Sequence, residues 1–297
     1  FRVSTLPTQF GEKVVIRVLD SSGAELSLKA LGLEEDQFKL YEEAISKPYG
    51  MILVTGPTGS GKTVSLYSAL STLNSPEINI SSVEDPIEIN VPGINQVAIN
   101  ERADLTFAVA LRAFLRQDPD VVMVGEIRDL ETADIAVKAS QTGHLVLSTL
   151  HTNDAPSTVV RLLNMGVEPF NVASSVHLIM AQRLVRKLCS QCRQPAKHPD
   201  EALIRAGFSP EPDIGEIKIY GPGGCDECTG GYKGRTGIFQ VMPVTEAVST
   251  MILRDAGQDA IEKQITHEGV LSLRQAGLKK VRAGITSLEE VLRVTSN

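Results

Sequence analysis

The sequence predicts an α/β fold built around a mostly parallel β-sheet. Between Gly50 and Leu150, short apolar stretches of strand length alternate with stretches of helical periodicity. Alternation of this kind is typical of a parallel sheet covered by helices on both faces. The chain of 297 residues is 42% hydrophobic and 22% charged, which is enough apolar material for a large buried core.

Bulk composition also limits the class of protein. No apolar run approaches the roughly 18 residues that a membrane-spanning helix needs. The net charge of −7 lacks the basic surplus that is typical of nucleic-acid-binding proteins. The chain begins at Phe1, inside a stretch that looks like a strand, so we expect a further N-terminal portion in the longer protein.

The regular elements are expected in a simple order. Residues 1–28 are β-like, because KVVIRVLD ends at the turn signal SSG, and the second half of LSLKALGLEEDQFKLYEEAIS has helical spacing. Strands are expected at MILVTG, INISSVED, DVVMVG and HLVLSTL. Helices are expected between them, at GKTVSLYSALSTL, TFAVALRAFLRQ and LETADIAVKASQTG, and again after HLVLSTL through Leu188.

The last third of the chain interrupts the alternation. Prolines and the run GPGG surround four cysteines, after which TGIFQVMPV is expected as a strand. Several short helices are expected from Thr245 onward. The last of them opens with the capping-box pattern Ser287-x-x-Glu290.

A phosphate-binding loop is the clearest motif. GPTGSGKT matches G-x-x-x-x-G-K-[ST] and lies between an expected strand and an expected helix, where such a loop wraps phosphate. We expect Lys62 to reach the β- and γ-phosphates of a nucleoside triphosphate and Thr63 to ligate Mg²⁺. The nucleotide-binding residues are expected to be Gly56, Pro57, Thr58, Gly59, Ser60, Gly61, Lys62 and Thr63.

Hydrolysis at such a loop needs one acidic group near the metal and another that orients the attacking water. Two segments compete to supply them. The first segment, DVVMVGE, ends in Glu126, which follows Gly125 at the position where the usual pattern of such hydrolases has an Asp. The second segment, VEDPIEIN, carries Glu84, Asp85 and Glu88. Taken alone, each acid is better explained as a solvated charge at a strand end, and the phosphate loop upstream reverses that preference for the group.

Four cysteines form two CxxC pairs, Cys189 with Cys192 and Cys225 with Cys228. Without a secretory signal, this pattern favours thiolates that bind a metal over disulfides. Two such pairs can close a tetrahedral structural Zn²⁺ site, with redox-active or free thiols as the alternative. The gap between the pairs is long for a compact zinc ribbon, but DEALIRAGF can form a helix within it.

Four segments in this order resemble the secretion ATPase superfamily: GPTGSGKT, SSVEDPIE, LRQDPDVVMVGEIRDLETADIA and TGHLVLSTLHTND. They look like its Walker A motif, Asp box, atypical Walker B motif and His box. The resemblance implies that Glu88 is the catalytic carboxylate and that Glu126 serves the Mg²⁺ and water network. It also implies that His151 senses the γ-phosphate with support from His144, although either histidine taken alone is better explained as structural.

The same resemblance implies a RecA-like fold and an assembly. In the family, arginines at positions that match Arg2, Arg17, Arg112 and Arg116 close over the phosphates, some across subunit or domain boundaries. By spacing alone, Arg112 and Arg116 lie on one helical face, and each of the four arginines taken alone is better explained as a solvated surface residue. The resemblance therefore implies a homo-hexameric ring with ATP at or near the subunit interfaces.

In the family, the tetracysteine segment is common in pilus assembly and type II secretion ATPases and is characteristically absent from the retraction ATPases of type IV pili. Stretches such as GITSLEEVLRVT favour the pilus assembly (PilB-like) branch, which resembles the type II secretion ATPases closely. The family implies a motor that hydrolyses ATP to drive pilin polymerisation through an inner-membrane platform protein. The alternative is a type II secretion ATPase that drives pseudopilus assembly. Either would be cytoplasmic, would lie at the bacterial inner membrane through its partners only, and would not bind nucleic acid.

The implied organisation has two parts. Residues 1–28 would end an N-terminal region, and 29–297 would form the ATPase domain, with a zinc-binding segment at 189–228 and a helical tail at 243–297. Two rival functions stay open. One is a nucleic-acid motor with a zinc ribbon, which the acidic balance and few aromatics disfavour, and the other is a nucleotide switch without hydrolysis, suggested by the missing Walker B Asp.

Overall fold

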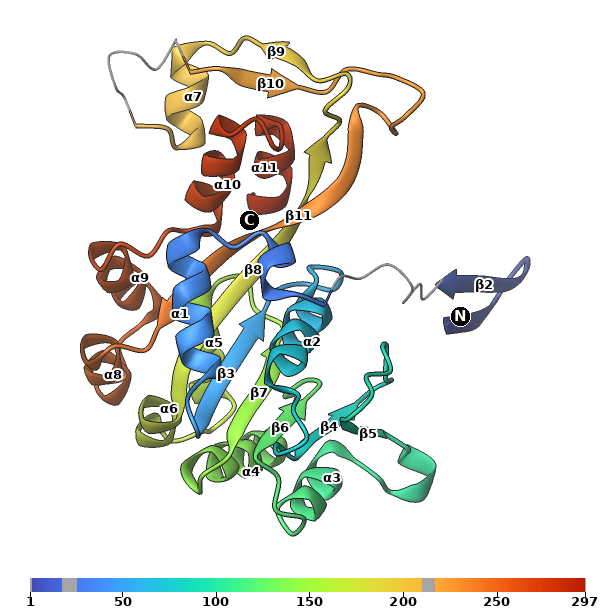
Figure 1. The fold of residues 1–297 in the computed structure, drawn as a ribbon, viewed down its shortest axis with the longest axis vertical. Helices are drawn as coiled ribbons and strands as arrows, with labels where there is room; N and C mark the ends of the chain where they lie inside the picture. Colours follow the sequence, from blue (N-terminus) through green and yellow to red (C-terminus); the bar gives the residue numbers. More distant parts are fainter. Residues whose placement is uncertain (1, 18–25, 210–216, 297) are drawn as a thin grey trace.

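The computed structural model describes residues 2–17, 26–209 and 217–296 (Figure 1). Its centre is a seven-stranded sheet with the strand order β11–β8–β3–β7–β6–β4–β5, in which all neighbours are parallel except β11 and β8. The expected mostly parallel α/β fold is therefore confirmed. The strands are β3 (Gly50–Thr55), β4 (Ile80–Glu84), β5 (Asn95–Ala98), β6 (Val121–Val124), β7 (Leu145–Leu150), β8 (Val176–Leu188) and β11 (Tyr232–Pro243).

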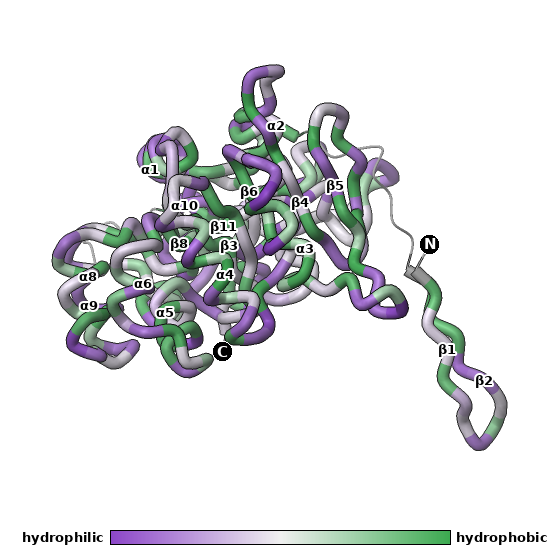
Figure 2. The backbone as a smooth tube through the Cα atoms, turned by 90° about the horizontal axis from the view of Figure 1, so that it is seen from below, coloured by the Kyte–Doolittle hydropathy of each residue, from purple (hydrophilic) through white to green (hydrophobic). Residues whose placement is uncertain are grey.

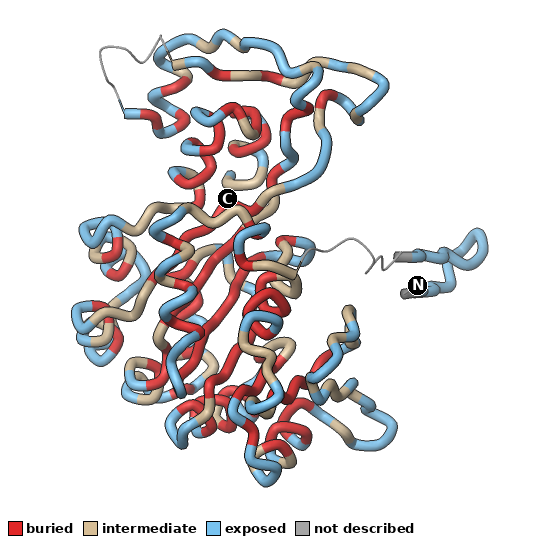
Figure 3. Tube along the Cα trace, viewed as in Figure 1, coloured by how far each residue is buried: buried red, intermediate tan, exposed pale blue. Residues whose placement is uncertain are grey.

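Both faces of the sheet are covered, so its central strands are buried along most of their length (Figure 3). In β3, Met51 and Leu53 belong to one hydrophobic core, and Ile52 and Val54 belong to the other. Successive residues of a strand point to opposite faces, so a strand buried on both faces becomes a continuous apolar run. This is why the strands could be recognised from sequence.

The two cores are built by different helices. The core that contains Ile52 also takes side chains from the 3₁₀-helix η1 (Leu28–Leu31) and from α1 (Glu35–Ile45) and α2 (Lys62–Leu73). The other core takes side chains from α3 (Phe107–Phe114), α4 (Leu130–Gln141), α5 (Ala155–Asn164), α6 (Pro169–Ser175), α7 (Asp200–Ala206), α8 (Glu246–Leu253), α9 (Gln258–His267), α10 (Leu273–Arg282) and α11 (Leu288–Thr295). The C-terminal helices and the helix between the cysteine pairs are thus confirmed.

One expected element is wrong. The segment before Leu188 was expected to be helical throughout, but only α5 and α6 are helices and Val176–Leu188 forms the long strand β8. The sequence VHLIMAQRLVRKL is rich in good helix formers, which is the source of the error. Pairing on both sides, with β3 and with β11, overrides that local preference.

Several small elements lie outside the expected pattern. The edge strand β5 pairs with β4, and the short strands β9 (Gln194–Ala196) and β10 (Ile219–Gly221) form a separate ladder. A 3₁₀ turn, η2 (Glu101–Ala103), precedes α3. None of these has the length or the periodicity that makes an element visible in sequence.

The N-terminal segment forms a hairpin. Strands β1 (Arg2–Thr8) and β2 (Gly11–Arg17) are antiparallel, and the hairpin carries exposed hydrophobic residues such as Leu6 and Phe10 (Figure 2). Residues 18–25 lie outside the described part of the chain, so the division at residue 28 into an N-terminal remnant and an ATPase domain stays a prediction.

The last helix is held by a buried ionic group. Ser287 caps α11 by accepting from the Glu290 backbone N–H, but the Glu290 carboxylate binds Arg186 and Arg293 instead of completing a capping box. Burial alone would raise the pKa of Glu290, yet hydrogen bonds from these two arginines lower the pKa to about 2.

Among the described residues, no helix combines the length and apolar character needed to cross a membrane.

Candidate active site

The phosphate loop connects β3 to α2 at the carboxyl edge of the sheet. Gly56 has φ +149°, and a Cβ at this position would lie 2.5 Å from the Gln182 carbonyl oxygen and 2.6 Å from Ser60 Oγ. Gly61 has φ +90° and directly precedes the first residue of α2, Lys62. The loop therefore requires glycine at these two positions for steric and conformational reasons. Because α2 begins at the end of the loop, the positive end of its helix dipole faces the concave side of the loop.

Lys62 is folded back over this loop. Its Nζ donates to the carbonyl oxygens of Gly56 at 2.8 Å and of Pro57 at 3.2 Å. Burial lowers the pKa of Lys62, Glu126 opposes that shift, and the nearby Arg183 adds to it. The ammonium group thus lies in a partly desolvated position between an acidic and a basic side chain.

Four parallel strands end beside the loop, and each end contributes to one pocket. β3 leads into the phosphate loop, β4 into Asp85 and Glu88, β6 into Gly125 and Glu126, and β7 into His151. Parallel strands bring their carboxyl ends to one edge, which is where α/β proteins bind ligands. The resulting pocket has a volume of about 720 Å³ and is lined in part by Thr58, Gly59, Gly61, Lys62, Thr63, Asp85, Glu88, Glu126, Arg128 and His151.

The carboxylate of Glu126 is largely buried and has two partners. It forms an ion pair with Arg128 and lies 3.3 Å from His151 Nε2. Arg128 also reaches Asp85 Oδ2 at 3.4 Å, and the hydrogen bond that Arg128 donates to Glu126 raises the pKa of Arg128. The ends of β4, β6 and β7 are thereby connected through polar and charged side chains.

Gly125 lies at a close approach between two strands. A Cβ on this residue would be 3.2 Å from the Val83 carbonyl oxygen and 3.4 Å from Glu84 Cα. The Gly125 N–H donates to the same Val83 oxygen at 2.8 Å. The glycine that replaces the usual Asp therefore allows β6 to pass tightly against the end of β4.

The two histidines lie at opposite ends of β7. His151 follows the strand and lines the pocket, where the loop is held by Thr152, whose N–H and side-chain oxygen both bind Thr55 Oγ1. His144 precedes the strand, and its Nδ1 lies 2.9 Å from the Ala139 carbonyl oxygen at the end of α4. His144 does not line this chain's pocket, because the length of β7 separates the two, and its expected supporting role stays a prediction.

Of the four expected arginines, Arg112 and Arg116 do not line the pocket. Arg112 pairs with Glu131 at 2.6 Å on the exposed side of α3, and Arg116 donates to the Arg112 carbonyl oxygen. Arg2 and Arg17 are register partners across the β1–β2 hairpin, and their side chains lie outside the described part of the chain. Their expected role at the phosphates stays a prediction.

Other arginines, which sequence reasoning missed, lie at the site. Arg128 and Arg235 line the main pocket, while Arg183, Arg186, Arg235 and Arg293 line a second hollow of about 380 Å³ beside the phosphate loop. Arg128 could have been noticed, since it lies two residues after Glu126 within the same motif. Arg183 and Arg235 had no such signal, because they reach the loop only through the pairing of β8 with β3 and β11.

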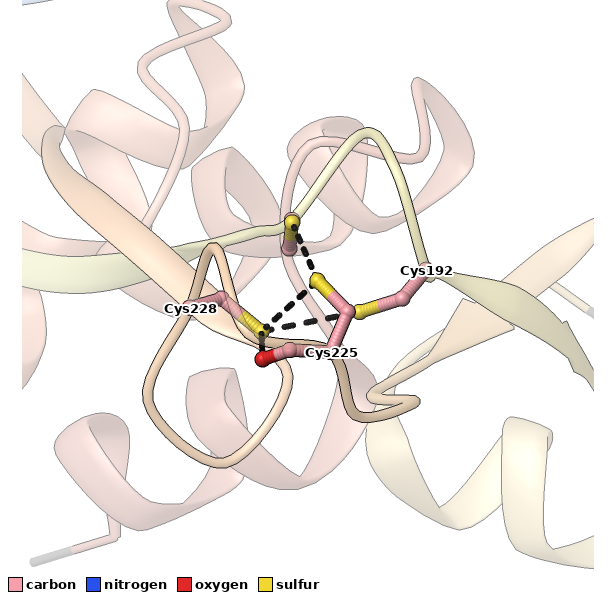
Figure 4. A group of neighbouring side chains, drawn as sticks. Cys192, Cys225 and Cys228 are labelled. Carbon is pink, nitrogen blue, oxygen red and sulfur yellow. Dashed lines mark hydrogen bonds between the residues drawn. The ribbon is translucent and has the colours of Figure 1, made fainter.

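The four cysteines form a second candidate site, away from the pocket. Their sulfur atoms all lie within 4.8 Å of one another, and Figure 4 shows Cys192, Cys225 and Cys228 pointing toward a common centre. The Sγ–Sγ distances are 3.8 Å for Cys189–Cys225 and 3.6 Å for Cys192–Cys228 and Cys225–Cys228. Four sulfurs placed tetrahedrally at about 2.3 Å from Zn²⁺ lie about 3.8 Å apart, so the donor set fits this ion.

A parallel α/β sheet with this loop, two carboxylates and a histidine at its carboxyl edge defines a phosphate-loop nucleotide-binding protein. The family model described as Type II/IV secretion system protein matches residues 1–293. The chain belongs to this family, and the resemblance inferred from the four motifs is confirmed.

The most similar relatives belong to both branches that the sequence left open. The chain is 60% identical over 297 residues to the type IV pilus assembly ATPase PilB of Pseudomonas aeruginosa and covers 52% of its length. It is 52% identical over 295 residues to the type II secretion system protein E of Aeromonas hydrophila and covers 58% of its length. The chain thus spans little more than half the length of these curated relatives.

Solved structures agree on the fold. A crystal structure of the pilus retraction motor PilT with bound ADP is 26% identical and aligns with a TM-score of 0.71, covering 99% of this chain and 73% of PilT. The Legionella pneumophila ATPase DotB, at 20% identity, aligns with a TM-score of 0.69 over 98% of this chain and 71% of DotB. Both similarities extend over nearly the whole chain.

Proposed function

We propose that this chain is the motor part of a type IV pilus assembly ATPase, which hydrolyses ATP to add pilin subunits through an inner-membrane platform protein. The observation that carries the proposal is one pocket lined by Lys62, Thr63, Glu88, Glu126 and His151. Those side chains come from four strand ends and match the parts that phosphoryl transfer to water needs: a phosphate clamp, a metal ligand, and acids on two sides.

Each side chain has a distinct role in this proposal. Lys62, which donates to two loop carbonyls here, would donate to the β- and γ-phosphates instead, and Thr63 would ligate Mg²⁺. Glu126 is already held by Arg128 and His151, so it would reach the metal ion through water. Glu88 is exposed at the pocket wall and is free to orient the attacking water, while His151 would sense the γ-phosphate.

The test is a steady-state ATPase assay on three variants with single substitutions. Glu88→Gln keeps the shape of the side chain and should lower turnover by roughly 100-fold or more while ATP still binds. Lys62→Ala should weaken ATP binding itself, because the loop loses its phosphate-binding cation. Glu43→Gln, an exposed glutamate on α1, serves as the control and should be unchanged.

Wild-type turnover in Glu88→Gln would contradict the assignment of Glu88. Negligible turnover in the wild-type protein, with ATP bound, would instead favour a nucleotide switch. ATPase stimulation by DNA, and not by the cytoplasmic domains of a platform protein, would favour a nucleic-acid motor.

The choice of pilus assembly over type II secretion rests on similarity to the relatives. Identity to the PilB protein of Pseudomonas aeruginosa is 60%, against 52% to the type II secretion protein of Aeromonas hydrophila. In this proposal the protein is cytoplasmic and reaches the inner membrane through its partners. The platform protein that co-purifies with the full-length form decides between the two branches.

We also propose that the four cysteines hold one structural Zn²⁺. A closed Cys₄ site leaves no coordination position for a substrate, so its contribution would be to the stability of the segment between β8 and β11. The cysteine geometry supports this role, because the four sulfurs are already at tetrahedral spacing.

A further inference from the structure

A buried hydrogen-bonded group lies between the phosphate-loop helix and the segment that carries Glu88. The Tyr67 hydroxyl, on α2, donates to Glu84 Oε2 at 2.6 Å. Gln96 Nε2, on β5, donates to the same hydroxyl at 2.8 Å and approaches Glu84 Oε1 at 3.4 Å. Ser82 Oγ donates to Glu84 Oε1 at 2.7 Å, so both oxygens of this buried carboxylate have partners.

The direction of these hydrogen bonds follows from the chemistry. Burial and the neighbouring Glu84 both raise the pKa of Tyr67, which keeps the phenol protonated at neutral pH. A protonated hydroxyl can donate to Glu84 and accept from Gln96 at the same time. Because an unpaired buried carboxylate is costly, the group holds together as a unit.

The same glutamine also holds the loop that follows Glu88. Gln96 Nε2 donates to the Ile89 carbonyl oxygen at 2.9 Å, and its Oε1 accepts from the Val91 N–H at 2.8 Å. Ile89 is the residue directly after Glu88. Gln96 therefore connects the backbone beside Glu88 to Tyr67.

Tyr67 continues this connection to the phosphate loop. It lies on α2, the helix whose first two residues are Lys62 and Thr63, and it borders a small cavity of about 90 Å³ together with Lys62, Thr63, Glu84 and Glu88. α2 thus connects the phosphate loop, through the hydrogen bonds of Tyr67 and Gln96, to the end of β4 and to the Glu88 segment.

We propose that Tyr67, Glu84 and Gln96 are positioning residues that set the place of Glu88 relative to the phosphate loop. The proposal rests on the proposed role of Glu88 in hydrolysis. None of the three touches the reacting atoms. They act by fixing the backbone on either side of the pocket, where a displacement of about 1 Å can cost roughly 100-fold in rate.

The experiment compares two buried tyrosines on the full-length protein. Tyr67→Phe removes the hydroxyl that bridges Glu84 and Gln96. Tyr41→Phe is the matched control, because Tyr41 is fully buried and its hydroxyl also binds α2, at the Ser65 carbonyl oxygen, away from the Glu88 segment. We expect Tyr67→Phe to lower kcat roughly 10- to 100-fold with KM for ATP within about threefold, and Tyr41→Phe to change neither by more than about threefold.

A second variant removes the hydrogen bonds that Gln96 makes. Gln96→Leu keeps the size of a half-buried side chain but removes its bonds to Tyr67, Ile89 and Val91. It should lower kcat in the same way, and the Tyr67→Phe/Gln96→Leu double variant should lose less than the product of the single effects. Thermal unfolding of each variant shows that the loss of rate occurs in folded protein.

The outcomes separate this proposal from the proposed function. If Glu88→Gln is inactive while Tyr67→Phe and Tyr41→Phe lose activity equally, the positioning role is overturned and the function stands. A rise in KM with unchanged kcat, or unchanged kinetics in Tyr67→Phe, overturns it as well. If Glu88→Gln turns over at the wild-type rate, the proposed function itself fails.

Discussion

Gly125 stands where the usual motif has an Asp, and the structure gives a steric reason for a glycine at this position. An Asp at this position would bring a Cβ to 3.2 Å from the Val83 carbonyl oxygen, at the strand end that also carries Glu84. The acidic groups are instead supplied by Glu126 and by Glu88 on the neighbouring segment. The missing Walker B Asp is therefore compatible with a complete set of carboxylates around the pocket.

We predict that Gly125→Ala disturbs the pocket without unfolding the protein. The added methyl must push β6 and β4 apart by a few tenths of an ångström, which should lower the free energy of unfolding by about 1 kcal/mol. Turnover should fall as well, because Glu84 and Glu126 move with their strands. Chemical denaturation and ATPase assays measure the two effects.

Gly257→Ala is the matched control for this substitution. Gly257 has φ −66° and no atom within 4 Å of an added Cβ, so the added methyl meets no neighbour. Because Gly257 is the N-cap of α9, where alanine is less favourable than glycine, the free energy of unfolding should also fall by about 1 kcal/mol, but turnover should not change. A Gly125→Ala protein as stable and as active as the wild type would contradict the steric explanation.

At the scale of elements, β8 and β11 decide much of the architecture. Both are longer than the other strands of the sheet, and the cysteine pairs lie directly beyond the paired ends of these two strands. The Cys189 N–H donates to the Gly231 carbonyl oxygen at 2.9 Å, so the base of the cysteine segment is also tied by the backbone. A metal ion bound by the four cysteines would tie together the two ends of the segment between β8 and β11.

We predict that metal removal destabilises this segment. Purified protein should contain close to one zinc ion per chain, and a chelator should lower the thermal unfolding midpoint, because the four thiolates lose the ion that holds them together. Cys192→Ser should reproduce the loss of zinc, while Ser190→Ala, at an exposed position within the same CxxC pair, should keep it. Four titratable thiols in metal-free native protein would contradict the proposal.

For the whole molecule, the parallel sheet decides where the chemistry lies. Its strands end at one edge, so the phosphate loop and His151, about a hundred residues apart in sequence, share a pocket that is open to solvent. Arg112 on α3 and Arg116 just after this helix are exposed and do not line this pocket. In the proposed ring, these arginines would reach a phosphate bound by a neighbouring subunit.

We predict that the full-length protein forms a hexameric ring with nucleotide bound. Sedimentation velocity with Mg²⁺ and a non-hydrolysable ATP analogue should show a species of six times the monomer mass, because each bound nucleotide would be completed by a neighbour's side chains. Lys62→Ala, which should bind nucleotide poorly, is the control and should not respond to the analogue. A protein that stays monomeric in every nucleotide condition would count against the ring.

Much of the site was predictable because its signals are local. The phosphate loop is eight consecutive residues, and each cysteine pair has its own short spacing. Glu88 and Glu126 each lie within a few residues of the end of a strand that its hydrophobic residues make recognisable. These patterns are dictated by the geometry of phosphate and metal binding, which a short peptide segment largely satisfies by itself. The helical assignment of β8 failed for the opposite reason, because its conformation depends on two partner strands.

By itself the sequence determined the fold class, the phosphate loop, the acidic residues of the pocket and the cysteine set, because short-range spacing and hydrophobic periodicity encode them. Only the tertiary structure excluded His144 from the pocket, brought Arg128, Arg183 and Arg235 to the phosphate loop, and joined Tyr67 to Glu84 and Gln96. Those contacts cross between strands and helices that are distant in the chain. Strand order and register create them, and neither is written in any local stretch of residues.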